Sequence, residues 1–323
     1  LNIVCLILLV YQTLLCYNIL IVLKTLQIML FKRSAMNTYQ KTGYLTENFR
    51  YFHLQTTSRQ DFHYHYHEFY KILFFLKGDV IYHIEGRAFH LLPGDIVLIP
   101  AEEIHCPQLQ SDTCYERQIL YLSSTFLKSF QDNDLSLCFT NARKRQSYVM
   151  RVPSLYQKHI WDILLCLEDE IKENSLYAGK LYQETLVSQL LILLNRAALN
   201  QQSIYPDNTC QNEKILFILD YINKHLSDNL TIDNLSERFF ISRYHLMHLF
   251  KASTGYTVGN YITIKRLFFA KALIQSGTPV TEACYLSGFQ NYSTFSRAYK
   301  KHFHTSAKNR EFSNGHNGNS MVE

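Results

Sequence analysis

The sequence predicts an α+β protein of several domains: an N-terminal β-barrel (jelly roll), central helices, and a C-terminal all-α domain with two helix-turn-helix motifs. Three observations predict this architecture. Short apolar or alternating runs separated by turn residues extend from Tyr44 to about Leu122. From Pro153 the apolar period becomes helical. The last third of the chain contains a near-repeat of one helical unit.

Residues 1–35 are a hydrophobic extension, almost unbroken from Leu1 to Leu23 and followed by Lys32 and Arg33. This length and basic flank would suit a membrane segment, and the absence of a small-residue cleavage site argues against a secretory signal. Because Met36 opens the globular-looking sequence, we expect an upstream extension of the reading frame. A membrane-tethered protein is the alternative.

The barrel is expected over residues 36–150. The stretch "YKILFFLKGDVIYHIEGRAFHLLPGDIVLIPAEEIH" reads as four strands joined by Gly-Asp, Glu-Gly and Pro-Gly-Asp turns. Strands spaced this closely are typical of a small barrel or jelly roll.

Two central helices are expected over residues 151–200. One apolar stripe consists of Ile160, Ile163, Leu164, Leu167 and Ile171. We predict that Ile160, Leu164, Leu167 and Ile171 of this stripe pair with their copies in a homodimer, and the alternative is that they are core. Three further ranges follow: a polar linker at 201–211, helices over 212–312, and a disordered tail at 313–323.

The repeat lies in "TIDNLSERFFISRYHLMHLFK" and "VTEACYLSGFQNYSTFSRAYK". In each, a second helix follows a capping residue, Ser242 or Asn291. Each places large apolar residues four and eight positions after its cap, where they share one face. The pattern predicts two helix-turn-helix units joined by one long helix.

Charge separates the two halves of the chain. Residues 36–211 contain sixteen basic and nineteen acidic side chains, whereas residues 212–312 contain thirteen and seven. Only the basic last third is therefore expected to meet a polyanion. The eight cysteines are scattered without a CxxC pair, which favours free thiols in a reducing, cytoplasmic compartment.

The segment "LTIDNLSERFFISRYHLMHLFKASTG", then "YITIKRLFFAKALI" and "VTEACYLSGFQNYSTFSRAYKKHF", resembles the DNA-binding domain of AraC-type transcription regulators. Only its end departs, because Ala307 stands in place of the proline that the family usually has. The resemblance implies that each second helix enters a major groove of double-stranded DNA.

Carrying the family's positions across gives three expected sets of DNA contacts. Base edges would be read from the first helix by Tyr244, Met247 and His248. They would be read from the second helix by Tyr292, Ser293, Thr294, Ser296 and Arg297. Backbone contacts would come from Arg243, Lys251, Lys265, Lys300 and Lys301. Arg297 is the strongest reader, since a guanidinium bonds bidentately to guanine.

The stretch "HYHYHEFY", residues 63–70, resembles the first motif of cupin-like sensing domains. His65, His67 and His105 match that family's metal-binding histidines, but Lys71 stands where metal cupins have a glutamate. A protonated lysine opposes a divalent cation, so no metal and no cofactor are expected.

Alternation would instead place His63, His65 and His67 on one face with His105. The expected effector pocket, suited to a small sugar-like molecule, comprises His65, His67, Tyr70, Lys71, Tyr82 and His105. Individually, these histidines could instead be buried and satisfied.

No catalytic constellation is visible, so we expect a cytoplasmic, ligand-responsive, sequence-specific DNA-binding regulator and not an enzyme. Its expected partners are double-stranded DNA, a small-molecule effector, RNA polymerase and a second copy of the chain. A metal-dependent cupin enzyme with an attached helical domain is the rival hypothesis.

Overall fold

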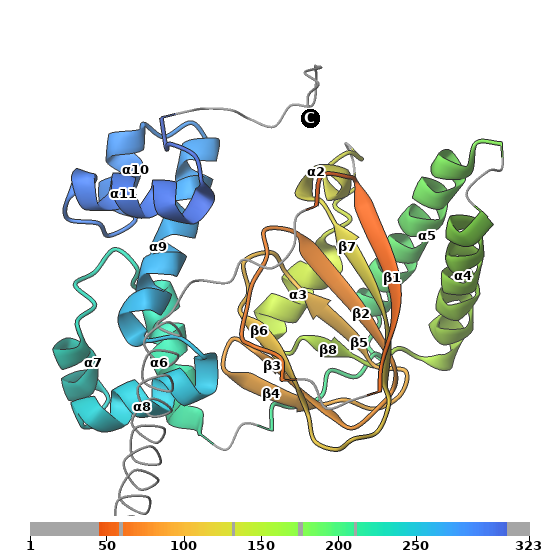
Figure 1. Cartoon of the computed structure of the whole chain (residues 1–323), viewed down its shortest axis with the longest axis horizontal. Helices are drawn as coiled ribbons and strands as arrows, with labels where there is room; N and C mark the ends of the chain where they lie inside the picture. The colour runs from red at the N-terminus through yellow and green to blue at the C-terminus, as the bar shows by residue number, and fades with distance from the viewer. Residues whose placement is uncertain (1–44, 58–60, 131–132, 174–176, 210–211, 309–323) are drawn as a thin grey trace, which may run out of the picture. The chain divides into compact units, whose positions relative to one another are not determined.

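The computed structural model describes residues 45–57, 61–130, 133–173, 177–209 and 212–308 (Figure 1). The predictions about the hydrophobic extension at 1–35 and the tail at 313–323 lie outside these residues. Below, residues 45–209 are called the sheet domain and residues 212–308 the C-terminal helices.

Two antiparallel sheets form the sheet domain, as the strand pattern predicted. The larger sheet has the order β1 (Phe49–Thr56), β7 (Tyr115–Leu122), β2 (Tyr70–Lys77), β5 (Ile96–Ile99) and β8 (Val149–Met150). The smaller sheet has the order β4 (Arg87–His90), β3 (Val80–Ile84) and β6 (His105–Leu109). A hydrogen bond from Lys71 on β2 to Tyr82 on β3 spans the interior between the two sheets.

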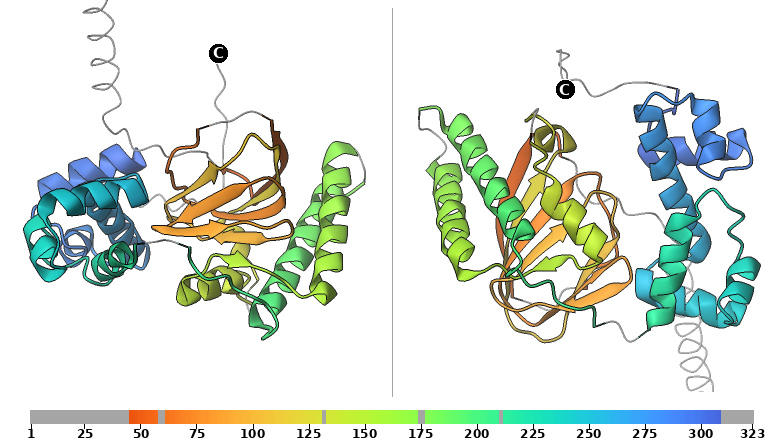
Figure 2. Two further views of the ribbon diagram at one scale, coloured as in Figure 1. Left: turned by 90° about the horizontal axis from the view of Figure 1, so that it is seen from below. Right: turned by 180° about the vertical axis from the view of Figure 1, so that it is seen from behind.

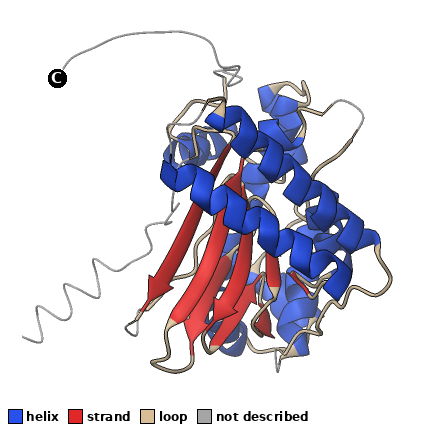
Figure 3. Cartoon of the chain, turned by 90° about the vertical axis from the view of Figure 1, so that its right-hand side faces the viewer, coloured by secondary structure: helices blue, strands red, loops and turns tan. Residues whose placement is uncertain are grey.

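Helices cover the outer face of the larger sheet (Figure 3). They are α2 (Ser124–Leu127), α3 (Leu137–Arg145), α4 (Ser154–Glu173) and α5 (Gly179–Leu199). Side chains alternate along β2, so Ile72 and Phe74 face this helical layer, and both are fully buried. They share one hydrophobic core with α4 and α5.

The predicted dimer stripe on α4 is part of this core. Ile160, Leu164 and Leu167 are at most 1% exposed within a single chain, and all three pack in the cluster that joins the sheet to α5. The prediction that this stripe pairs two subunits is therefore wrong, because its apolar surface is already covered by the chain's own helix and strands.

The C-terminal helices contain the two predicted helix-turn-helix units. Their elements are α6 (Glu213–Lys224), α7 (Ile232–Arg238), α8 (Arg243–Thr254), α9 (Val258–Gln275), α10 (Val280–Leu286) and α11 (Tyr292–Phe303). The side chains of Ser242 and Asn291 accept backbone N–H groups at the starts of α8 and α11, as a capping residue does. The side chains expected to be buried four and eight positions after each cap are buried: Leu246, Phe250, Phe295 and Tyr299. Among the residues that the structure describes, no helix combines the length and apolar character needed to cross a bilayer.

The polar segment after α5 lies against the sheet domain. Ile204 forms an isolated antiparallel bridge with Arg151, and the Thr209 N–H donates to the Ala88 carbonyl over 2.8 Å. Figure 2 shows this segment running along the sheets before α6 begins. The described part of the predicted linker is thus held by backbone hydrogen bonds.

Candidate effector site and nucleic-acid interface

Alternate side chains of the segment Tyr64–Glu68 point to opposite sides: one set faces the interior between the sheets, and the other faces the C-terminal helices. It is joined to β6 through His65, whose N–H and carbonyl each bond with His105 over 3.1 and 2.8 Å. This bridge directs His65 and His67 toward His105. Tyr64, Tyr66 and Glu68 point the other way, as residues in extended backbone do.

On the inward side, three imidazoles converge. The ligand-capable nitrogens of His65, His67 and His105 all lie within 4.8 Å of one another. Each Nδ1 lies 2.8–2.9 Å from a backbone carbonyl, that of His63, Phe69 and Glu103 respectively. The Nε2 atoms of His67 and His105 are buried and have no hydrogen-bond partner. This arrangement fixes the three rings and leaves two buried acceptors unsatisfied.

Burial keeps these imidazoles neutral. It lowers the pKa of His65 to about 4, with the Lys71 charge adding to the effect. The pKa values of His67 and His105 also fall well below their usual range, first because of burial and then because of neighbouring positive charge. At neutral pH each ring therefore has one lone pair.

Two residues of the predicted pocket line the same interior. The Lys71 ammonium donates to the Tyr82 hydroxyl over 3.1 Å, and both side chains are buried. The Tyr82 ring is nearly parallel to that of His105, with the centroids 6.2 Å apart. Burial, followed by the Arg117 charge, lowers the pKa of Lys71 to about 7. Lys71 therefore releases its proton far more readily than a lysine in water.

Two other expectations about this region are wrong. Tyr70 stands next to Lys71 on β2 and so takes the opposite face, where its ring packs 4.8 Å from Phe139 on α3. His63 is exposed, and its contribution is a backbone carbonyl for His65.

On the outward side, the same segment contacts the C-terminal helices. The Tyr66 hydroxyl lies 3.0 Å from Nε2 of His302 on α11, and the two rings stack. Glu68 forms a 2.7 Å ion pair with Lys271 on α9. The Tyr256 hydroxyl donates to the Tyr64 carbonyl over 3.3 Å. One short segment thus joins the imidazole cluster to α9, to α11 and to the turn before α9.

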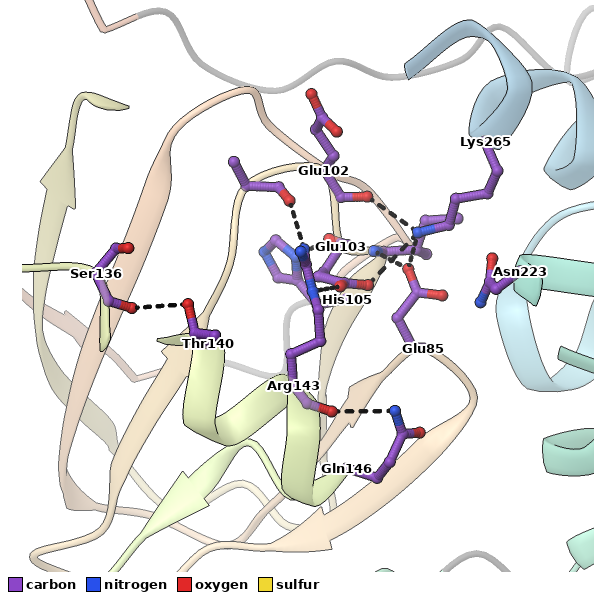
Figure 4. A network of polar contacts seen from close by, with 12 residues as sticks. Glu85, Glu102, Glu103, His105, Ser136, Thr140, Arg143, Gln146, Asn223 and Lys265 are labelled. Atoms are coloured by element: carbon purple, nitrogen blue, oxygen red, sulfur yellow. Dashed lines mark hydrogen bonds and ion pairs between the residues drawn. The ribbon is translucent and has the colours of Figure 1, made fainter. Parts of the chain in front are cut away.

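A second contact between the sheet domain and the C-terminal helices is ionic and buried (Figure 4). Lys265 on α9 lies 2.8 Å from Glu85 and 3.5 Å from Glu103. Glu103 is also paired with Arg143 on α3 over 2.8 Å. The Tyr261 hydroxyl donates to Glu85 over 2.5 Å. The four charged side chains of this network border a cavity of about 260 Å³.

This network corrects the expectation that Lys265 contacts the DNA backbone. The Lys265 side chain is only 13% exposed and is held by two carboxylates. Burial disfavours its charge, but Glu85 and Glu103 together raise its pKa above the usual range. Lys265 therefore joins the C-terminal helices to the sheet domain through two ion pairs. A DNA phosphate could reach its ammonium group only after these ion pairs separate.

Sequence reasoning missed Glu85 and Glu103. The sequence predicts a turn at Glu85, and its backbone has a φ of +48°, the left-handed conformation that such turns require. Gly86 follows with a φ of +76°, and a Cβ there would collide with Leu219 on α6. The only signal in the sequence is the Glu-Gly pair, which predicts a turn and gives no indication of a partner 180 residues away.

The predicted DNA-reading side chains lie mostly on the exposed faces of α8 and α11. Tyr244 is 77% and Met247 44% exposed, and His248 is exposed as well. On α11, Ser293, Thr294 and Arg297 are exposed, whereas Tyr292 and Ser296 are partly buried. The remaining backbone candidates, Arg243, Lys251, Lys300 and Lys301, are exposed, and Arg243 pairs with Asp233 over 2.6 Å. Their contacts with DNA remain predictions.

Comparison with known families gives two matches. A family described as "AraC-like ligand binding domain" matches residues 50–191, and one described as "Helix-turn-helix domain" matches residues 235–309. Together they cover most of the sheet domain and most of the C-terminal helices.

Two curated relatives have low sequence identity to this chain but align with it over most of their length. The probable transcriptional regulator LumQ of Photobacterium leiognathi is 26% identical over 245 residues, which is 74% of this chain and 87% of LumQ. The HTH-type transcriptional activator RhaS of Shigella sonnei is 24% identical over 255 residues, 77% of this chain and 87% of RhaS. Among solved structures, the C-terminal domain of AraT from Geobacillus stearothermophilus is 26% identical over 30% of this chain and 81% of its own, with a TM-score of 0.29. ToxT from Vibrio cholerae is 14% identical over 80% of this chain and 96% of its own, with a TM-score of 0.30.

Proposed function

We propose that this chain, which belongs to the family of AraC-type transcription regulators, binds a small, polar, sugar-like effector. Regulators of this family bind DNA in response to a ligand. The proposed binding site lies between the two sheets. The relatives are regulators, so the rival hypothesis of a metal-dependent enzyme is set aside. Buried polar side chains support the proposed location: Lys71, Tyr82, His105 and Arg117 are each at most 7% exposed. Such groups in an otherwise apolar interior provide the few fixed donors and acceptors that a polar ligand requires.

The observation that carries the proposal is the alternation of the segment Tyr64–Glu68. Its inward histidines belong to the proposed effector site, and its outward side chains touch α9 and α11. A ligand that moves His65 or His67 must also move Tyr66, because the side chains share one short stretch of backbone. This gives a direct physical route from the effector to the DNA-binding helices.

The proposed DNA readout is tested most sharply at Arg297. Its guanidinium is exposed on α11, where a bidentate contact with guanine would account for specificity at one base pair. We expect Arg297→Ala to weaken specific binding by about 1–3 kcal/mol and to relax one base position in a binding-site selection. Unchanged base preference would show that the assignment of this position is wrong.

Lys300→Ala is the matched control, because Lys300 is an exposed cation on the same helix. A phosphate contact adds affinity without sequence information, so all DNA sequences should weaken alike. The slope of log affinity against log salt should become shallower by about 1.

We also propose a homodimer, through a face of α5 that differs from the stripe first predicted. Leu181, Ile192 and Leu199 are 65%, 40% and 67% exposed, and spacings of 11 and 7 residues place them on one side of the helix. A second copy would cover this apolar line and bring two DNA-binding units to neighbouring half-sites. We further propose that the protein works in the cytoplasm and acts on transcription through RNA polymerase.

Leu181→Glu combined with Ile192→Glu should give a folded monomer in analytical ultracentrifugation. Its affinity for a two-half-site DNA should fall toward that for one half-site, because the second contact is no longer intramolecular. Leu92→Glu is the control, since Leu92 is 48% exposed but lies in the turn between β4 and β5. A double variant that remains dimeric would exclude this face.

A further inference from the structure

The second helix of the first helix-turn-helix unit, α8, keeps large apolar side chains exposed. On α8, all of whose residues the structure describes, Tyr244 and Met247 are 77% and 44% exposed. They stand three positions apart and so lie side by side on one face of the helix. The side chains of Leu246 and Phe250 face the other way and are buried. Adjacent apolar side chains that stay exposed at a predicted reading position indicate an apolar partner.

The guanidinium that α8 could offer to a guanine is already engaged. Arg243 begins the helix and forms a 2.6 Å ion pair with Asp233 on α7, the first helix of the same unit. The outward face continues with His248, whose ring lies nearly parallel to that of Tyr244 with the centroids 6.3 Å apart. The N-terminal residues of such a helix are those that contact base edges. Here they bring two aromatic rings and a thioether to the bases, and the guanidinium among them is paired.

The corresponding helix of the second unit, α11, has the opposite character. Its outward face carries Ser293, Thr294 and Arg297, all of which are exposed. Its large aromatic side chains Phe295 and Tyr299 are buried. Hydroxyl groups and a guanidinium are hydrogen-bonding groups, and the guanidinium of Arg297 can bond bidentately to a guanine. The two helices are therefore equipped for different kinds of contact with bases.

We propose that α8 recognises thymine through its 5-methyl group, by contact with the apolar surfaces of Tyr244 and Met247. The inference rests on the proposed DNA-binding function and names the kind of base that one helix reads. In the major groove thymine presents a methyl group, and apolar side chains distinguish it by contact. The base pairs beneath α8, called the α8 subsite, are then rich in A·T pairs. The α11 subsite contains the guanine that Arg297 reads by hydrogen bonds.

The long helix α9 sets the spacing between the two subsites. It has 18 residues and is therefore about 27 Å long. α8 precedes it and α11 follows it, and Figure 1 shows them near opposite ends of α9. Successive major grooves on one side of a duplex are about 34 Å apart, or roughly 10 base pairs. We therefore expect the α8 subsite about one helical turn from the guanine that Arg297 reads.

The test replaces thymine with uracil, which keeps the base pair and removes only the methyl group. A specific site is first selected from random DNA with the full chain, and each thymine in it is then replaced singly. We expect the sensitive thymines to cluster in one subsite, roughly 10 base pairs from the position that Arg297→Ala relaxes. Each replacement there should lower affinity by about 4-fold, which corresponds to about 0.8 kcal/mol for one methyl-sized apolar group. Thymines elsewhere should tolerate the change.

Substitutions on α8 connect this sensitivity to its side chains. Met247→Gln keeps the length of the side chain but adds a polar end, so it should bring the ratio of thymine to uracil affinity closer to 1. Tyr244→Phe removes only the hydroxyl and should retain the ratio, because the ring surface makes the contact. His245→Ala is the matched control, since His245 is exposed on α8 but lies about 100° around the helix from Tyr244. It should leave the ratio unchanged.

Two outcomes overturn the inference alone. One is a specific site that contains no thymine, or whose affinity is unchanged by uracil at every thymine. The other is a methyl effect that persists undiminished when Met247→Gln is combined with Tyr244→Ala, which would assign it to another part of the protein. Both outcomes require sequence-specific binding, so they leave the proposed function in place. A chain that selects no DNA sequence would instead contradict the proposed function, and this inference with it.

Discussion

Replacing Lys265 with methionine is expected to separate the sheet domain from the C-terminal helices. The change removes the cation between Glu85 and Glu103 and leaves buried carboxylates with less compensation. Removing one partner of a buried ion pair costs about 3–5 kcal/mol. Separation of the two parts lowers this cost, because water can then reach Glu85. We expect one thermal unfolding transition to become two and proteolysis within residues 200–212 to accelerate.

Lys271→Met is the matched control for this variant. Lys271 lies on the same helix and also pairs across the contact, with Glu68, but both side chains keep more than a fifth of their surface exposed. A pair that is partly hydrated contributes at most about 1 kcal/mol. Equal effects of the two substitutions would contradict a special role for the buried pair. Adding Glu85→Gln to Lys265→Met should recover part of the loss, as two coupled partners do in a double-mutant cycle.

The second large effect is expected at Leu164, where glutamate should unfold the sheet domain. The side chain has no exposed surface and lies in the core shared by α4, α5 and the larger sheet. Truncating such a leucine costs about 2–5 kcal/mol, and a buried carboxylate without a partner adds several more. The sum is comparable to the whole stability of about 5–15 kcal/mol that a domain usually has.

The adjacent residue gives a contrasting variant. Leu165 is 58% exposed on the same helix, so Leu165→Glu should change the free energy of unfolding by no more than about 0.5 kcal/mol. Urea denaturation of both proteins, followed by circular dichroism, measures the difference. A folded Leu164→Glu protein would show that α4 is not fixed to the sheet.

Local patterns were enough to predict the helix-turn-helix units. Ser242 and Asn291 are caps that act on their own helices, and the buried positions after them follow the helical period. Each of these features depends on residues fewer than ten positions apart. The same holds for the strands from Tyr70 to Ile99, whose turns carry their own glycine and proline signals.

Contacts between segments that are far apart in the sequence could not be predicted from such local patterns. The sequence predicts a DNA-backbone contact for Lys265 because the residue lies in the basic segment that resembles a DNA-binding domain, while Glu85 and Glu103 lie more than 160 residues earlier. Tyr70 was placed in the pocket because aromatic residues suit ligands, but the register of β2 gives the inner face to Lys71. The α4 stripe looked like an interface because sequence does not reveal that α5 already covers it.

The alternation of the segment Tyr64–Glu68 also has a thermodynamic consequence. Its inner and outer side chains share one backbone, so if the proposed effector binds on the His65–His67 side, its occupancy and the position of α9 and α11 become coupled equilibria. Linkage is reciprocal: if a bound molecule changes the affinity for DNA by some factor, DNA changes the affinity for that molecule by the same factor. Operator DNA should therefore act as an effector of the sensing site, and its concentration will shift any ligand affinity measured for this protein.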